Sequence, residues 1–166
     1  MWSGGTTEGV QAVAIVANGG SGMSCGTGAT ATPTAGSAIY NLLGSTAVTP
    51  NDGSLTPGSV KTASLGVNFT TSKVGLEATI GIGGTDYALA TTGGAATPGL
   101  AYDTLGAFLG SGTLAGNGCS GTTCNARISG FLAGAGASHA GAAFTFQTAP
   151  TAGTQVSGVI AFAKGP

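Results

Sequence analysis

Glycine and threonine recur so often in this chain that they interrupt every window long enough for a helix. Glycine alone accounts for 33 of the 166 residues. Both residues are poor helix formers, glycine because it loses the most backbone freedom on folding and threonine because its branched side chain is restricted. The sequence therefore predicts a protein built from β-strands.

Short runs with apolar residues at every second position occur along the chain, as expected for half-buried strands. One run covers residues 10–17, and eight more cover residues 37–43, 60–69, 74–82, 87–90, 108–115, 126–131, 142–147 and 156–163. Turn signals separate them, the strongest being Gly83-Gly84. Many short strands favour a closed barrel, which has no exposed edge. We expect an all-β fold, an eight-stranded antiparallel up-and-down β-barrel, with a sandwich as the alternative.

Residues 18–36 separate the first run from the others and show no hydrophobic period. Their composition, rich in Gly, Ser, Thr and Ala, is typical of a linker or a long loop. We therefore divide the chain into residues 1–36, an additional N-terminal strand on a Gly/Thr-rich linker, and residues 37–166, the β-barrel domain. Shorter loops are expected at residues 49–58 and 91–99.

The core must be thin, because much of the apolar 42% of the chain is alanine. A fully buried large side chain contributes about 1.5–3 kcal/mol, so a dozen can support one domain but not two. The large core candidates are Tyr40, Leu42, Phe69, Leu76, Tyr87, Leu105, Phe108, Leu109, Phe131, Phe144, Phe146 and Phe162.

Charged residues are nearly absent: four Lys or Arg and five Asp or Glu give a formal net charge of −1. Nucleic-acid binding requires clustered Lys and Arg, and the four basic residues here are scattered. No apolar run approaches the ~20 residues of a membrane helix, so no transmembrane segment is expected. A net charge near zero favours association between copies of a protein.

The first strand has a second interpretation because it precedes a linker. Its residues Val10, Ala12, Val13, Ile15 and Val16 could join the chain's own sheet or be donated to a neighbouring subunit. A donated strand gains main-chain hydrogen bonds and side-chain pockets together. Such head-to-tail exchange builds open filaments unless the rotation closes a ring. We therefore expect a homo-oligomer or filament.

The chain contains three cysteines, and their spacing indicates the state of each. Cys119 and Cys124 lie in a turn-rich stretch between two predicted strands, and four intervening residues can close a small disulfide loop. Zinc is the alternative, but only Cys25 and His139 remain as further ligands, at no recognisable spacing. We expect a disulfide, no metal, and in Cys25 a free or intermolecular thiol.

Residues 1–5 lack the basic start and apolar centre of a signal peptide, which indicates a mature product, an excised domain or a cytosolic protein. The expected disulfide and the low charge favour the first two. We therefore expect an extracellular or bacterial cell-surface location.

Candidate catalytic residues are sparse. A triad could be assembled from Ser138, His139 and Asp103, but adjacent strand residues face opposite ways and no Gly-x-Ser-x-Gly elbow is present. Lys73 and Glu77 are interpreted as a solvated pair. We expect no catalytic residues, no enzyme activity and no cofactor.

Tyrosines offer a further alternative. Tyr40, Tyr87 and Tyr102 could line a haem or ligand pocket, and core packing is the competing interpretation.

Four segments, residues 37–46, 63–71, 128–134 and 156–162, resemble a known architecture. They are similar to the β-rich C-terminal region of proteobacterial proteins that carry an iron-dicitrate-sensor-type (FecR) domain. They also resemble the eight-stranded barrels of transferrin-binding-protein-B-like surface lipoproteins, which share the late Gly-Phe-Phe/Leu-x-Gly strand and the closing Val-Ser-Gly-Val strand. The resemblance covers about residues 37–164 and implies an exported or surface-displayed barrel without catalytic residues.

Two functions follow as expectations. The first is a non-enzymatic extracellular structural protein, a barrel subunit that self-associates into a filament or surface array, with N-terminal strand exchange as the mechanism. The alternative is a surface-displayed binding module for a protein or iron-carrying ligand, as the resemblance implies.

Overall fold

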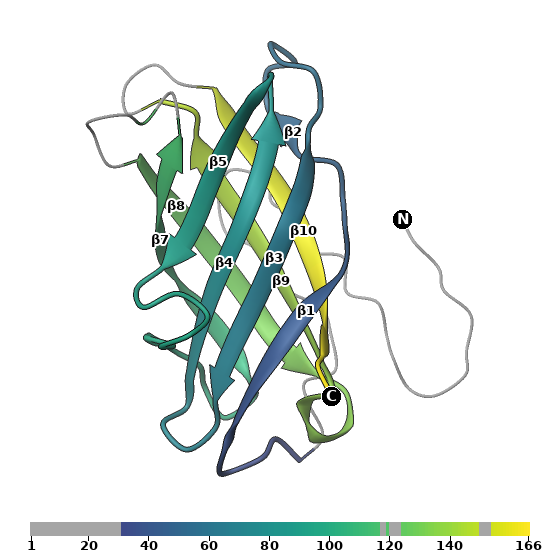
Figure 1. The fold of residues 1–166 in the computed structure, drawn as a ribbon, viewed down its shortest axis with the longest axis vertical. Helices are drawn as coiled ribbons and strands as arrows, with labels where there is room; N and C mark the ends of the chain where they lie inside the picture. The colour runs from purple at the N-terminus through teal and green to yellow at the C-terminus, as the bar shows by residue number, and fades with distance from the viewer. Residues whose placement is uncertain (1–30, 117–118, 120–123, 150–153) are drawn as a thin grey trace.

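The computed structural model describes residues 31–116, 119, 124–149 and 154–166. Eight long strands form the wall of a barrel (Figure 1). They are β1 (Ser37–Ser45), β3 (Ser59–Asn68), β4 (Lys73–Ile82), β5 (Thr85–Thr91), β7 (Ala107–Gly116), β8 (Cys124–Ala133), β9 (His139–Gln147) and β10 (Gln155–Lys164). Two short strands, β2 (Thr49–Pro50) and β6 (Leu100–Ala101), and a 3-10 turn, η2 (Ala135–Ala137), complete the described elements.

The wall closes because the first and last strands pair with each other. The antiparallel order is β1-β3-β4-β5-β7-β8-β9-β10, and β1 pairs β10 from Tyr40 opposite Lys164 to Ser45 opposite Ile160. Each long strand therefore pairs with the next one in the chain. The predicted up-and-down barrel is confirmed and the sandwich alternative is wrong. All eight predicted runs from residue 37 onward are strands of the ring.

One strand position in the wall is interrupted. β5 pairs β4 down to Ala90 opposite Glu77, and β6 pairs β4 again at Leu100 and Ala101. Both β5 and β6 also contact β7, so β6 continues the strand position of β5. Residues 92–99 between them form a loop outside the ring, which agrees with the predicted loop at 91–99.

The predicted tight turn joins β4 to β5. Gly83 and Gly84 have φ of +58° and +78°, the left-handed pair that a two-residue hairpin of type I′ requires. Glycine adopts this conformation without steric cost, whereas a Cβ would strain it. The turn therefore follows directly from the local sequence.

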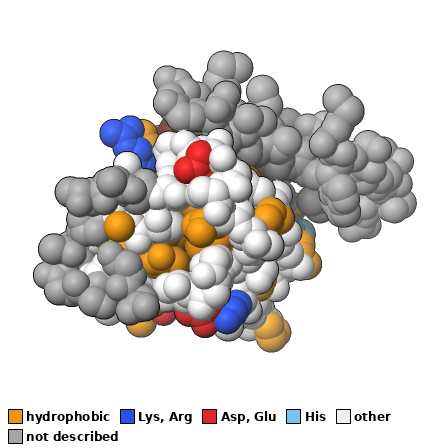
Figure 2. Space-filling view, turned by 90° about the horizontal axis from the view of Figure 1, so that it is seen from above, with side chains coloured by type: hydrophobic (Ala, Val, Ile, Leu, Met, Phe, Trp, Pro, Cys, Tyr) orange, Lys and Arg blue, Asp and Glu red, His pale blue; other side chains and the backbone are white. Residues whose placement is uncertain are grey.

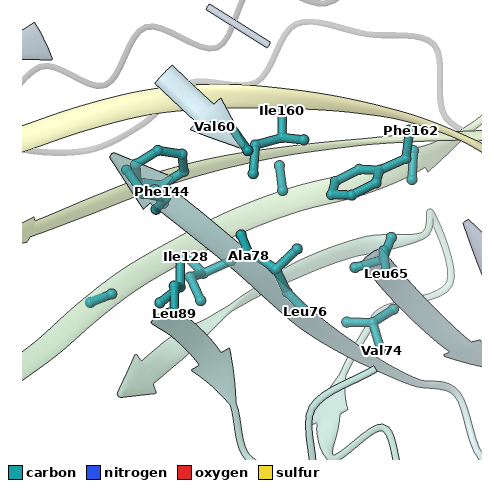
Figure 3. Close-up of a cluster of buried hydrophobic side chains, with 14 of the residues drawn as sticks. Val60, Leu65, Val74, Leu76, Ala78, Leu89, Ile128, Phe144, Ile160 and Phe162 are labelled. Atoms are coloured by element: carbon teal, nitrogen blue, oxygen red, sulfur yellow. The ribbon is translucent and has the colours of Figure 1, made fainter. Parts of the chain in front are cut away.

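Apolar side chains fill the interior. Alternate residues of every strand point inward, and Figure 3 shows side chains from facing walls, such as Leu76, Ile128 and Ile160, directed toward one another. Rings also lie over strand glycines: a Cβ at Gly158 would be 2.6 Å from the ring of Phe144. Glycine thus makes room for large rings where a narrow barrel would otherwise be overpacked.

Most of the predicted core is correct, and two members are wrong. The buried candidates are Tyr40, Phe69, Leu76, Tyr87, Phe108, Phe131, Phe144, Phe146 and Phe162, and Leu42 is partly buried against them. Leu105 and Leu109 are instead 71% and 75% exposed. Leu109 lies next to the inward-facing Phe108, so strand alternation directs it outward. Leu105 lies in the turn that precedes β7.

The predicted disulfide joins Cys119 to Cys124, with a Cα–Cα distance of 5.6 Å. The residues predicted as an N-terminal strand, and Cys25 with them, lie outside the described part of the chain. The boundary at residue 36, the donor strand and the intermolecular thiol therefore stay predictions.

Candidate binding surface

The barrel interior is packed rather than open, and the tyrosines are part of that packing. Tyr40 is fully buried and its hydroxyl donates to the carbonyl oxygen of Ala137. Burial, with the neighbouring Tyr102 as a second cause, raises the pKa of Tyr40 to about 12. Tyr87 packs against Phe146 with ring centroids 5.3 Å apart. These contacts support the core interpretation of the tyrosines over a ligand pocket.

The expectation that Ser138 and His139 face opposite ways is wrong. Ser138 Oγ and His139 Nδ1 are 2.9 Å apart and form a hydrogen bond. Ser138 has helical backbone angles at the end of η2, and only His139 belongs to β9, so strand alternation does not apply to the pair. Among the described residues no carboxylate hydrogen-bonds to His139, and Asp103 bonds to its own turn instead.

Charges on the described surface are mostly solitary. Lys61 and Asp86 form an exposed ion pair at 2.7 Å, bridging across Gly81 of the intervening strand. Lys73 and Glu77 do not form the predicted pair. Within the described ranges no group of three His, Cys, Asp or Glu residues is placed to hold a metal ion.

The outer surface of β3 and β4 is covered by the chain itself. The 92–99 loop lies on the bare backbone of two glycines, since a Cβ at Gly66 would overlap the carbonyl oxygen of Ala95 and one at Gly75 would overlap that of Gly94. Ala95 is buried by this contact. This part of the wall is therefore already occupied.

The outer side of the wall at β7, with one strand position between it and β4, carries the most exposed large apolar side chains of the described chain. Leu105 and Leu109 stand on the outer side of β7 and its preceding turn, with Ala107 between them. We call Leu105 and Leu109 the leucine ridge. Both side chains leave most of their apolar area in water, and burial of such area against a partner is favourable.

Asp103 positions one end of the leucine ridge. Its Oδ1 accepts hydrogen bonds from the backbone N–H groups of Leu105 and Ala107, each at 2.9 Å. The Gly106 N–H donates to the Asp103 carbonyl at 2.9 Å and closes the turn, with Gly106 at φ +79°. Leu105 is thus displayed on an ordered turn. Asp103 followed by Gly106 is the sequence signal that could have indicated such a turn.

A second apolar region lies beside the ridge on the outside of β8, β9 and β10. Phe131 and Ala143 are buried there, with Ala107, Ala133 and Val159 packed against them. The ring of Phe131 lies over Gly141, where a Cβ would be 3.1 Å from it. We call Phe131, Ala133, Ala143 and Val159 the outer patch.

The end of the barrel near the β4–β5 turn carries hydrophobic side chains as well. Figure 2 shows this end, where hydrophobic side chains lie among polar and backbone atoms and acidic and basic side chains surround them. The loop after β2 is tied to the start of β10, because the Ser54 and Thr154 hydroxyls are 2.9 Å apart. Asp52 accepts from the Ser54 N–H at 2.9 Å, and hydrogen bonds from Ser54 lower the pKa of Asp52.

Comparisons with solved structures find barrels of transferrin binding protein B. One is the isotype 1 protein of serogroup B Neisseria meningitidis, which matches with a TM-score of 0.53 and 17% identity over 80% of this chain and 26% of that chain. Two are mutants of the Haemophilus parasuis Hp5 vaccine antigen, with TM-scores of 0.49 and 0.48, identities of 13% and 12%, and coverage of 80% of this chain and 27% and 26% of theirs. No family model and no curated protein matches the chain.

These likenesses concern the fold. The chain is similar to the barrel of transferrin binding protein B, in agreement with the resemblance of its strand motifs, and spans about a quarter of the meningococcal protein. Nothing in the comparisons supports the FecR part of the resemblance. In the residues that the structure describes, no helix has the length and apolar character needed to cross a membrane.

Proposed function

We propose that this chain is a non-enzymatic binding module, displayed on a bacterial cell surface, whose barrel binds a protein partner through the leucine ridge. The observation that carries the proposal is the exposure of Leu105 and Leu109 on a rigid wall. The backbone that carries them is already ordered, in strand β7 and in the Asp103 turn, so little backbone freedom is lost on binding.

The packed interior and the fold likeness support the same function. The interior side chains pack against one another as a hydrophobic core, which favours the outer wall and the loops as the place of recognition. The similar structures are named for binding transferrin, and an iron-carrying protein of that kind is therefore the first partner to test. Surface display follows from the resemblance to surface lipoproteins and is favoured by the disulfide.

Filament assembly by strand exchange has less support. An added strand needs an unpaired edge, and β1 and β10 pair with each other from Tyr40 to Ser45. Self-association stays a separate prediction, and a measurement of mass in solution tests it.

The binding proposal is tested with immobilised full-length chain and purified transferrin, in iron-loaded and iron-free forms. We expect saturable binding, and a loss of roughly tenfold or more in affinity for Leu105→Ser with Leu109→Ser, since each anchor leucine contributes about 1 kcal/mol or more. Leu43→Ser is the matched control, because Leu43 is also an exposed leucine, on β1.

Equal affinities for the ridge variant and the control would contradict the ridge as the interface. Absence of binding in both iron states would overturn the iron-carrier assignment. Catalytic turnover of any bound partner would contradict a non-enzymatic role.

A further inference from the structure

A basic side chain lies on each side of the leucine ridge, and the first is Arg127 of β8. In the pairing of β7 with β8, Ser129 lies opposite Leu109, and Arg127 lies two residues from Ser129. Arg127 is thus a diagonal neighbour of Leu109, with their Cα atoms about 7–8 Å apart. Both side chains are exposed, because the residues next to them in each strand point into the barrel. The guanidinium of Arg127 is therefore within reach of a surface that covers Leu109.

The second basic side chain, Lys73, lies on the other side of the ridge. Lys73 begins β4 and pairs with Ala101 of β6. The bridge between Tyr102 and Phe108 places Ala101 next to Leu109 of β7. Lys73 is therefore two strand spacings, roughly 10 Å, from Leu109. Its neighbour in β4 is buried, so the Lys73 side chain is directed outward like that of Leu109.

Neither cation has a carboxylate partner in the described part of the chain. The exposed ion pair found there joins Lys61 of β3 to Asp86 of β5 and includes neither Lys73 nor Arg127. An intramolecular partner would have neutralised the positive charge beside the ridge. Without one, Lys73 and Arg127 are free to meet carboxylates from outside the barrel.

The carboxylates closest in the fold are engaged with backbone. Asp103, at the start of the turn that carries Leu105, accepts hydrogen bonds from two backbone N–H groups with its Oδ1. The Glu77 carboxylate lies against Gly94 of the 92–99 loop, where a Cβ on Gly94 would overlap it. Neither carboxylate forms an ion pair within the residues that the structure describes. The surroundings of the ridge thus carry two unpaired cations against the one carboxylate of the Asp103 turn.

This charge pattern distinguishes the possible occupants of the ridge. Two copies of the chain, ridge against ridge, would bring two unpaired cations from each copy together, and like charges in contact oppose binding. A lipid surface recruits proteins through clusters of about 4–8 basic residues, whereas the whole chain has four Lys or Arg. A protein segment with carboxylates beside apolar side chains complements both the leucines and the cations.

Given the binding function proposed above, we propose that the partner of the leucine ridge is an acidic protein segment. Its apolar side chains cover Leu105 and Leu109, and its Asp or Glu side chains pair with Lys73 and Arg127. The apolar contacts supply most of the affinity, since they lie at the centre of the interface. The ion pairs lie at its rim, where they add modest affinity and mainly accelerate association.

The test begins with a random-peptide library displayed on phage and selected on the immobilised full chain. A selected peptide is a ridge ligand when Leu105→Ser with Leu109→Ser reduces its affinity and Leu43→Ser does not. We expect the ridge ligands to combine large apolar residues with an excess of Asp and Glu, and to bind more weakly at high salt, which screens exposed charges. Ridge ligands without an excess of acidic over basic residues would overturn the inference and leave the ridge as a binding surface.

Charge variants then measure the contribution of the two cations. Lys73→Gln with Arg127→Gln should weaken the binding of an acidic ridge ligand by roughly fivefold. The matched control, Lys61→Gln with Lys164→Gln, removes the same charge from exposed positions elsewhere on the barrel and should change the affinity by less than about twofold. Equal affinities for the two double variants would overturn the pairing, because they would reflect overall charge alone.

Three other outcomes would overturn the binding function together with this inference. Selection without any ridge ligand would contradict the ridge as a surface that binds proteins. Binding to phosphatidylglycerol vesicles that the ridge variant loses, with no acidic ridge ligand found, would assign the ridge to a lipid surface. A dimer mass in sedimentation that the ridge variant loses, again without an acidic ridge ligand, would assign it to a second copy of the chain.

Discussion

The Thr91 hydroxyl accepts a hydrogen bond from the backbone N–H of Leu76 at 2.8 Å, in the place where a strand carbonyl would otherwise stand. The carbonyl of Thr91 turns away to accept from the Gly94 N–H, because the chain leaves the wall there to form the 92–99 loop. Thr91 is the buried polar residue of the described core. The Thr91 side chain therefore replaces the missing backbone hydrogen bond between β4 and β5 at the point where β5 ends.

Replacing Thr91 by Val should destabilise the barrel by about 1–3 kcal/mol, since the buried N–H of Leu76 loses its acceptor while the side-chain shape is kept. Urea unfolding measures the change. Thr113→Val, on the exposed side of β7, is the control and should stay within about 0.5 kcal/mol. Equal effects of the two substitutions would show that the hydroxyl of Thr91 does not support the wall.

The docking of the 92–99 loop depends on the missing side chain of Gly66. Gly66→Ala places a Cβ on the carbonyl oxygen of Ala95, so the loop must move, at a cost of about 1–3 kcal/mol or more. Gly44→Ala is the matched control in β1, where nothing lies within 4 Å of the added atom. Hydrogen exchange of the Gly94 amide should accelerate in the first variant alone. An unchanged loop in Gly66→Ala would contradict the packing.

Asp103 holds the turn that displays Leu105. Asp103→Ala removes the acceptor for two backbone N–H groups and should cost about 1–2 kcal/mol, with faster exchange of the Leu105 and Ala107 amides. Asp103→Asn keeps the oxygen and should retain most of the protection. Asp86→Ala breaks the exposed ion pair with Lys61 and should cost less than about 1 kcal/mol. The same exchange rates in all three variants would exclude a positioning role for Asp103.

The raised pKa of Tyr40 predicts that the free energy of unfolding of the barrel decreases at alkaline pH. Its pKa is raised from 10.0 to about 12, so the folded barrel holds the phenolic proton more tightly than the unfolded chain. The associated stability is fully present below pH 10 and is lost as the pH rises toward 12, in total about 2–3 kcal/mol. Burial also raises the pKa of Tyr87, which acts in the same direction. Unfolding free energies from pH 8 to 11.5 should fall less steeply for Tyr40→Phe, and parallel curves would refute this linkage.

Local sequence determined the strands and several of their connections. Alternation of apolar residues located all eight ring strands, and Gly83-Gly84 specified its turn because its backbone angles are a local property. The spacing of Cys119 and Cys124 indicated a disulfide because only four residues lie between the two. These features depend on contacts between near neighbours, which a single sequence displays directly.

Tertiary structure decided which surfaces the strands present. Closure depends on Tyr40 meeting Lys164, a pairing of distant residues that no local pattern specifies. Leu105 and Leu109 are as apolar as core residues, but the fold places Leu105 in the turn before β7 and directs Phe108 rather than Leu109 into the interior. From the sequence, Gly66 is only a residue that weakens a strand. In the structure, its missing side chain makes room for the carbonyl oxygen of Ala95 in the 92–99 loop. The alternation of apolar residues along a strand shows which residues share a face. Whether that face is buried depends on which other segments of the folded chain pack against it.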